Sequence, residues 1–171
     1  MLFFYALIVS ISFLNGGDKL ENYEINSNTL ALVSKNGKTK VYELDKVFMV
    51  EKSANEIVED SCSFFGSSLS GRQKGTASLI GVTYKCPIII EESKNIIFFP
   101  TCSPRIATCS WISLNNIETY YSTDSKRVII KFKNGQKLYI SSTYGVIDNQ
   151  ILRSTRLESV LRGRINQKSF N

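Results

Sequence analysis

The amino-acid sequence predicts an α+β fold: antiparallel strands and hairpins with a short central helix and a long C-terminal amphipathic helix. Two Asn-Gly pairs, Asn36-Gly37 and Asn134-Gly135, each lie between strand-like segments, and such pairs favour tight hairpin turns. Near the C-terminus the period changes, and apolar residues recur along one broad side of a helix of about twenty residues. These apolar positions are Ile147, Ile151, Leu157, Val160, Leu161 and Ile165.

Charge is distributed unevenly along the 171 residues. Residues 1–60 hold six basic and nine acidic side chains, whereas residues 61–171 hold fifteen basic and six acidic ones, a net of +9. A hydrophobic share of 43% indicates a globular chain rather than a disordered one. The basic part predicts a polyanionic partner, nucleic acid or an anionic membrane, and the alternative is a solvated basic face without a partner.

The sequence contains no histidine, which removes the commonest general base and metal ligand. Tyr, Ser, Cys and Lys are present, but no spacing pairs a nucleophile with a base. Four cysteines without a Cys-x-x-Cys motif favour buried thiols over a zinc site or disulfides; they are Cys62, Cys86, Cys102 and Cys109. We therefore expect no catalytic residue, metal, cofactor or small-molecule substrate.

The first nineteen residues open with the apolar run MLFFYALIVSISFL. The run is shorter than the roughly 18 apolar residues of a membrane span, and no basic residue or cleavage site marks a signal peptide. The codons GGA-GGT-GAT, which resemble a bacterial ribosome-binding sequence, can encode the Gly-Gly-Asp before Leu20, and TTG or CTG can encode a leucine start. Our hypothesis is that residues 1–19 are upstream read-through, and the alternative is a hydrophobic N-terminal extension that anchors the chain. A native product that begins at the first methionine would exclude the hypothesis.

Residues 20–171 are interpreted as one domain. The segments TLALVSK and KTKVYEL form the first hairpin, and residues 47–50 form a third strand. Ser53 and Glu56 have the spacing of a capping box, which predicts a helix from about 54 to 64 that stops at Gly66.

The later elements alternate between short strands and loops. Residues 76–84 fit a helix and a strand equally well. Apolar runs bounded by proline and polar residues predict buried strands, and a loop and further strands follow. These segments are strands at 87–90, 96–99, 109–112 and 117–121, a loop at 100–108, and the hairpin RVIIKF with KLYIS.

The stretch CSFFGSSLSGRQKGT, residues 62–76, is rich in glycine and serine, a composition typical of exposed turns and ligand-binding loops. It lacks the Lys-Ser/Thr end of a phosphate loop and the closing glycine of a nucleophile elbow. We interpret Gly71 and Gly75 as flexible hinges around Arg72, Gln73 and Lys74, which suit phosphates or a narrow minor groove. The alternative is a solvated loop whose arginine pairs with a carboxylate.

Several collinear blocks carry a resemblance to a known family. They are Ser61-Cys-x-Phe-Phe-Gly-Ser-Ser68, Gly71-Arg72, Gly75-Thr76, Pro87 with its apolar run, Asn95-x-Ile-x-Phe-Pro-Thr101, Cys109-x-Trp-Ile-Ser113, the hairpin at Asn134-Gly135, and Asn149-Gln150-x-x-Arg153. From about Glu21 to Ile165 the chain resembles the ComK family of competence transcription factors, activators of DNA-uptake genes in Gram-positive bacteria. The apolar start has no counterpart there, and longer members continue past Asn171 with a tail that in some serves adaptor-mediated proteolysis, so the resemblance does not extend to that control.

The resemblance implies a cytoplasmic DNA-binding activator that recognises paired AT-rich promoter boxes mainly through the minor groove. It also implies bending or wrapping of the DNA and a homo-oligomer, and such an activator could contact RNA polymerase. AT pairs offer only acceptors in the minor groove, so cationic donors suit the site, and we expect them on one exposed flank. The DNA-binding candidates are Arg72, Lys74, Arg105, Lys131, Lys133 and Arg153, with Gln73 as a polar reader.

Aromatic side chains could act as wedges between base steps, but we expect the apolar runs to be core. These side chains are Phe64, Phe65, Phe98, Phe99 and Trp111. An alternative function is a non-catalytic module whose basic face docks on anionic lipid or an acidic protein. Partition of the chain between an AT-rich duplex and anionic vesicles separates the two functions.

Overall fold

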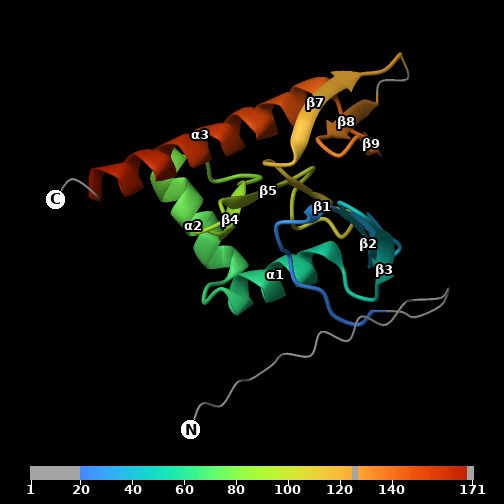
Figure 1. The fold of residues 1–171 in the computed structure, drawn as a ribbon, viewed down its shortest axis with the longest axis horizontal. Coiled ribbons are helices and arrows are strands. Elements are labelled where there is room, and N and C mark those ends of the chain that lie inside the picture. The colour runs from blue at the N-terminus through green and yellow to red at the C-terminus, as the bar shows by residue number, and fades with distance from the viewer. Residues whose placement is uncertain (1–19, 125–126, 169–171) are drawn as a thin grey trace, which may run out of the picture.

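The computed structural model describes residues 20–124 and 127–168, and within them the α+β prediction is confirmed (Figure 1). The strands are β1 (Thr29–Lys35), β2 (Lys38–Glu43), β3 (Val47–Val50), β4 (Ile88–Glu91), β5 (Ile96–Pro100), β6 (Trp111–Ser113), β7 (Ile117–Ser122), β8 (Val128–Phe132) and β9 (Lys137–Ile140). The helices are α1 (Ala54–Phe64), α2 (Leu69–Ile80) and α3 (Tyr144–Lys168). The hypothesis about residues 1–19 lies outside the described residues.

Two antiparallel sheets form the framework. In the described part of the chain, one sheet has six strands in the order β3-β2-β1-β6-β5-β4 and the other has the order β7-β8-β9. The first hairpin prediction is confirmed: Asn36 and Gly37 both have positive φ angles, 51° and 77°, and Lys35 pairs with Lys38. Such angles match the twist of the flanking strands. The second hairpin is confirmed as well, between β8 and β9.

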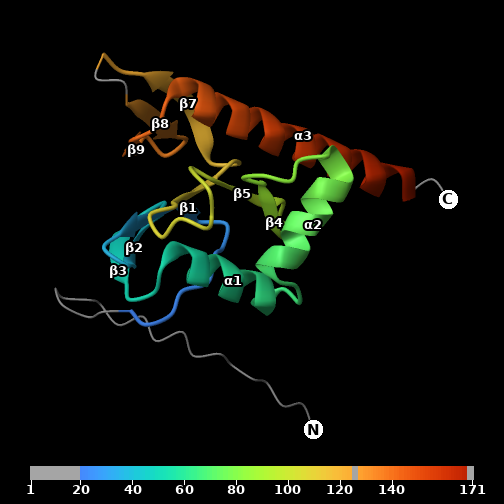
Figure 2. The same ribbon diagram turned by 180° about the vertical axis from the view of Figure 1, so that it is seen from behind.

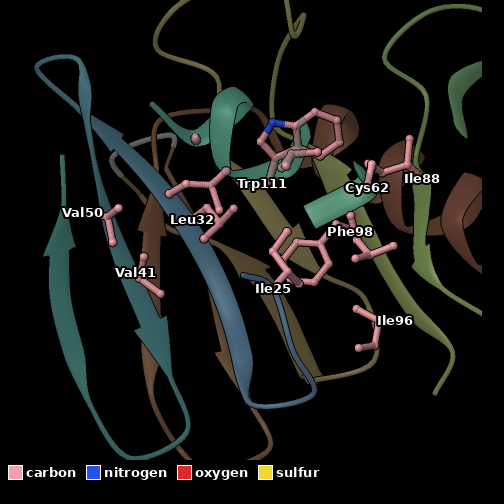
Figure 3. Packing of buried hydrophobic residues seen from close by; sticks show 13 residues of the cluster. Ile25, Leu32, Val41, Val50, Cys62, Ile88, Ile96, Phe98 and Trp111 are labelled. Atoms are coloured by element: carbon pink, nitrogen blue, oxygen red, sulfur yellow. The ribbon is translucent and has the colours of Figure 1, made fainter. Parts of the chain in front are cut away.

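The larger sheet is covered on both faces at its centre, which explains why β5 is a continuous apolar run that is buried along its whole length. Helix α1 packs on one face, where Phe98 and Trp111 are fully buried among the residues of Figure 3. The second sheet and α3 cover the other face, where Phe99 and Ile112 are buried. The expectation that the aromatic runs are core is confirmed for these residues and wrong for Phe64, which is 63% exposed.

Helix α1 begins with the predicted capping box. The Ser53 hydroxyl accepts a hydrogen bond from the Glu56 amide at 3.3 Å, and the Glu56 carboxylate accepts one from the Ser53 amide at 2.8 Å. Both bonds satisfy amides that the helix itself leaves unpaired. The hydrogen bonds from the Ser53 side chain and backbone hold the pKa of Glu56 below its ordinary value.

Ser53→Ala is expected to lower the free energy of unfolding by about 1 kcal/mol, because one first-turn amide of α1 loses its acceptor. The pKa of Glu56 should rise toward its ordinary value, since its main hydrogen-bond donor is gone. A carboxyl whose folded pKa is depressed stabilises the fold above its unfolded pKa and loses that contribution as pH falls through the folded value. Urea unfolding at neutral and acidic pH should therefore show a smaller difference between variant and wild type at acidic pH. An equal difference in unfolding free energy at both pH values would contradict the link between Ser53 and the ionisation of Glu56.

Helix α2 corrects the interpretation of residues 71–75 as a hinged loop. Ser68 accepts a hydrogen bond from the Gly71 amide at 2.9 Å and starts the helix, so both glycines lie inside it. Each interior glycine costs about 1 kcal/mol. Tertiary contacts offset this cost: the Thr76 hydroxyl donates to the Pro87 carbonyl at 2.6 Å, and Ile80 packs against α3 and the sheet. Of residues 76–84, which fitted a helix and a strand equally well, those up to Ile80 are helical. The helix ends at Gly81, which has a left-handed backbone conformation.

Helix α3, 25 residues long, lies along one side of the molecule from the second sheet to α2 (Figures 1 and 2). Its predicted apolar side is confirmed at Ile147 and Leu157, which are buried, whereas Ile165 is 57% exposed. Among residues 20–124 and 127–168, no helix has the length and apolar character that a membrane crossing requires. Because α3 reaches across the fold, it positions loops that belong to distant parts of the sequence.

Candidate nucleic-acid interface

A hollow of about 280 Å³ lies where α2, the segment before β4 and the loop between β5 and β6 meet. It is lined by Leu69, Gln73, Thr83, Tyr84, Lys85, Cys86, Ser103, Pro104 and Arg105. Two predicted candidates, Gln73 and Arg105, are thus brought together from distant parts of the sequence. None of these described lining residues is acidic, so the hollow has a basic rim without a neutralising carboxylate.

Buried and half-buried polar groups of α3 hold the rim in place. The Gln150 amide donates to the carbonyls of Pro100 at 2.6 Å and Lys85 at 3.0 Å, and Arg153 donates to the Tyr84 carbonyl at 3.1 Å. Gln150 is 1% exposed, so its amide group has lost its hydrogen bonds to water. The two bonds to backbone carbonyls offset the free-energy cost of that burial. Arg153, a predicted DNA contact, therefore uses one guanidinium nitrogen to hold the backbone at Tyr84.

The opposite wall is fixed by α1. The Asn55 side chain donates to the Pro104 carbonyl at 2.6 Å and accepts from the indole of Trp111 at 2.8 Å. The Arg105 amide lies 3.4 Å from the Ser103 hydroxyl. The backbone that carries Arg105 is thereby tied to the core, while its side chain is exposed.

Two cations that line the hollow, and a third on the adjoining helix α2, have no carboxylate partner among the described residues. Within the part of the chain that the structure describes, Lys74, Lys85 and Arg105 form no ion pair, and the Lys85 ammonium lies 5.3 Å from the centre of the Tyr84 ring. Lys74 is exposed on α2, one residue after Gln73. The positive potential of an unpaired cation is not offset by a neighbouring carboxylate, so it attracts an anionic ligand more strongly.

Arg72 has a different environment from its neighbour Lys74. Its guanidinium lies 3.3 Å from the Glu92 carboxylate and 3.5 Å from the Ile90 carbonyl, and its side chain is 17% exposed. This is the carboxylate pairing that the sequence left open as the alternative. The sequence predicts that Arg72→Ala weakens DNA binding without harming the fold, but in this position the residue also supports the packing of α2 against β4.

Lys131 and Lys133 lie on and just after β8 of the second sheet. The Lys131 ammonium lies 2.7 Å from the Glu118 carboxylate, which raises the pKa of Lys131 through a hydrogen bond and charge attraction. Lys133 donates to the Asn115 carbonyl at 2.5 Å. Gln73 and Arg105 line the hollow, whereas Lys131 and Lys133 belong to the second sheet. The expectation that all seven candidates share one exposed flank stays a prediction.

Lys85 is a member of the rim that the sequence-based candidates omit. Its φ angle is +50°, which is uncommon for a residue with a side chain. The Gln150 amide donates a hydrogen bond to the Lys85 carbonyl and holds this backbone against α3. A lysine between a tyrosine and a cysteine carries no motif. Only its contact with α3 brings it beside Arg105, so no signal in the sequence could have identified it.

The thiols give the site no evident chemistry. Cys62, Cys86 and Cys109 are buried, as predicted, and Cys102 is half-buried. Burial raises the pKa of Cys62 to about 11 and that of Cys109 to about 12, so both remain protonated and poorly nucleophilic at neutral pH. Among the described residues, no three His, Cys, Asp or Glu side chains cluster as a metal site would require.

Comparison with known proteins gives two matches. The sequence profile of the family described as ComK protein matches residues 20–166. A curated protein of Bacillus subtilis (strain 168), named competence transcription factor, is 34% identical over 153 residues, which cover 87% of this chain and 80% of that protein. None of the solved structures matches the chain.

Proposed function

This chain belongs to the ComK family of non-catalytic transcription factors, and from that premise we propose that it activates competence genes by binding paired AT-rich promoter boxes mainly through the minor groove. Its partner is double-stranded promoter DNA in the cytoplasm. Two boxes call for at least two copies of the chain, so we propose a homo-oligomer that also contacts RNA polymerase.

The basic rim of the hollow is the observation that supports this proposal. Lys85 and Arg105 in the rim, with Lys74 next to Gln73 on α2, supply donors without acceptor capacity, and the minor groove of AT pairs presents only acceptors. The groove is also narrow in AT-rich DNA, which concentrates negative potential there and favours inserted arginine. Arg105, exposed on a loop whose backbone is anchored at Pro104, is the side chain best placed to enter it.

Lys74→Ala and Arg105→Ala test the proposal on the full chain with an AT-rich duplex from upstream of a DNA-uptake gene. Wild-type affinity should fall steeply with salt, because each phosphate contact releases counterions. Each variant should weaken binding and reduce the slope of log affinity against log salt by about one unit. Binding measured by fluorescence anisotropy at several salt concentrations gives both quantities.

Lys35→Ala is the matched control, because it removes the same charge from the exposed end of the first hairpin. It should leave the slope nearly unchanged. Two results would exclude the rim as the contact surface. They are a wild-type affinity that does not change from low to moderate salt, and a loss of affinity in Lys35→Ala equal to that in the rim variants.

The groove can be tested on the DNA side. Replacing A·T pairs by inosine–cytosine pairs preserves the minor-groove pattern and changes the major-groove one. Affinity should survive that replacement and fall when G·C pairs are introduced, since guanine adds a donor to the minor groove. The opposite ranking would overturn minor-groove recognition and leave DNA binding itself intact.

A further inference from the structure

The second sheet has one face in the core and one face in solvent. Cross-strand pairing places Tyr121, Ile129 and Tyr139 in one row across β7, β8 and β9. The next row on the same face is Thr119, Lys131 and Lys137. The alternate residues point to the opposite face and are buried against the larger sheet and α3; they are Val128, Ile130, Phe132 and Leu138.

Aromatic rings dominate the first outer row. Tyr121 is 38% exposed and Tyr139 is 62% exposed, while Ile129 between them is 7% exposed. Neighbouring strands are about 4.8 Å apart, so the two tyrosines are separated by about 10 Å with an apolar floor between them. These two exposed rings contribute little to the core, and neighbouring exposed aromatic side chains are typical of a binding surface.

Positive charge dominates the second row. Lys131 and Lys137 are directly opposite each other in the register, an arrangement of like charges that destabilises an isolated sheet. Glu118 neutralises Lys131, but Lys137 forms no ion pair with any described residue. Lys133 follows on the same hairpin and is exposed. An anionic group placed over this row would therefore pair with Lys137 and with Lys133.

We propose that this outer face binds single-stranded nucleic acid, with bases stacked on Tyr121 and Tyr139 and phosphates contacted by Lys131 and Lys137. Rows of aromatic rings beside cations are the recurring arrangement of such surfaces, because every base has a ring face and every nucleotide a phosphate. An intact duplex keeps its base faces covered, so this activity goes beyond the duplex recognition proposed above. A lipid surface or an acidic protein would use the lysines without needing stacked rings.

The test uses the full chain and a labelled oligothymidylate of about fifteen nucleotides, with the AT-rich duplex measured in parallel. Tyr139→Ala should weaken oligothymidylate binding about tenfold or more, because each stacked base contributes that much, and should change duplex affinity less than twofold. Wild-type tyrosine fluorescence should be quenched by the oligonucleotide. Lys137→Ala should lower the salt slope on the single strand by about 0.7.

Two variants make the result specific. Tyr139→Phe keeps a ring on the face and should retain binding, which separates stacking from folding. Tyr144→Ala removes a tyrosine that is 45% exposed but stacks on Tyr120 at the start of α3, away from the outer face, and should change neither affinity.

Three results would overturn the inference. They are no binding of oligothymidylate at concentrations that saturate the duplex, an equal loss of both ligands in Tyr139→Ala, and a preference of the face for anionic vesicles that Tyr139→Ala abolishes. Failure of duplex binding with retained single-strand binding would instead refute the proposed promoter recognition and leave this inference standing. Melting temperatures of all variants exclude unfolding as the cause.

Discussion

Trp111→Ala is expected to lower the free energy of unfolding by about 3–5 kcal/mol, the range found when large core aromatics are truncated. Trp111 is fully buried on β6, which pairs with β1 on one side and β5 on the other. Its loss leaves a cavity at the centre of the larger sheet. It also leaves the Asn55 carbonyl oxygen without the indole donor that lies 2.8 Å away.

Urea unfolding followed by far-UV circular dichroism measures this loss, because Trp111 is the one tryptophan in the sequence and fluorescence would disappear with it. Phe64→Ala is the matched control: the ring is 63% exposed, and its truncation should change stability by less than about 0.5 kcal/mol. Trp111→Phe should fall between the two, since it keeps most of the volume and removes the hydrogen bond. Equal effects of Trp111→Ala and Phe64→Ala would contradict the packing in Figure 3.

The double variant Lys85→Glu/Arg105→Glu is expected to weaken binding to an AT-rich duplex by about a hundredfold or more. Each cation that contacts DNA contributes about 1–3 kcal/mol, and reversal adds repulsion from phosphate. Both side chains line the hollow, and none of its described lining residues is acidic, so the two substitutions reverse the charge of its rim. Anisotropy titrations at fixed salt give the affinity, and circular dichroism checks the fold.

Lys35→Glu/Lys40→Glu is the control with the same change in net charge. Both residues belong to the first hairpin, and neither forms an ion pair with a described residue. If the protein bound DNA only through its overall charge, the two double variants would weaken binding equally. We expect the control to lose less than about fivefold, so the difference between the variants measures the contribution of the rim.

Local patterns predicted the elements whose reasons are local. The Asn36-Gly37 turn and the Ser53 to Glu56 capping box involve residues within a few positions of one another, and the structure confirms both. The period of α3 was readable because an amphipathic helix repeats its apolar residues along its own length. In each case the physical cause acts within a single segment.

Helix α2 was not predictable in this way. Its glycines and serines favour a loop, and the helix forms because Thr76 and Ile80 find partners on β4, β5 and α3. Those partners are unknown until the chain has folded, so contacts between distant segments reversed the local preference. The same reason explains the environment of Arg72. A loop would leave its side chain exposed, whereas the helix places it beside Glu92.

By itself, the sequence determined the fold class, the two hairpins, the absence of histidine chemistry, the excess of basic residues and the family. Only the tertiary structure decided which cations lie together. Gln73, Lys85 and Arg105 meet because α3 binds the carbonyls of one loop and α1 binds the carbonyl of another. Strand register places Lys131 opposite Lys137 on the second sheet. Charge is a property of each residue, whereas a binding surface is a property of distances, and these distances arise from burial and hydrogen bonds between segments far apart in the chain.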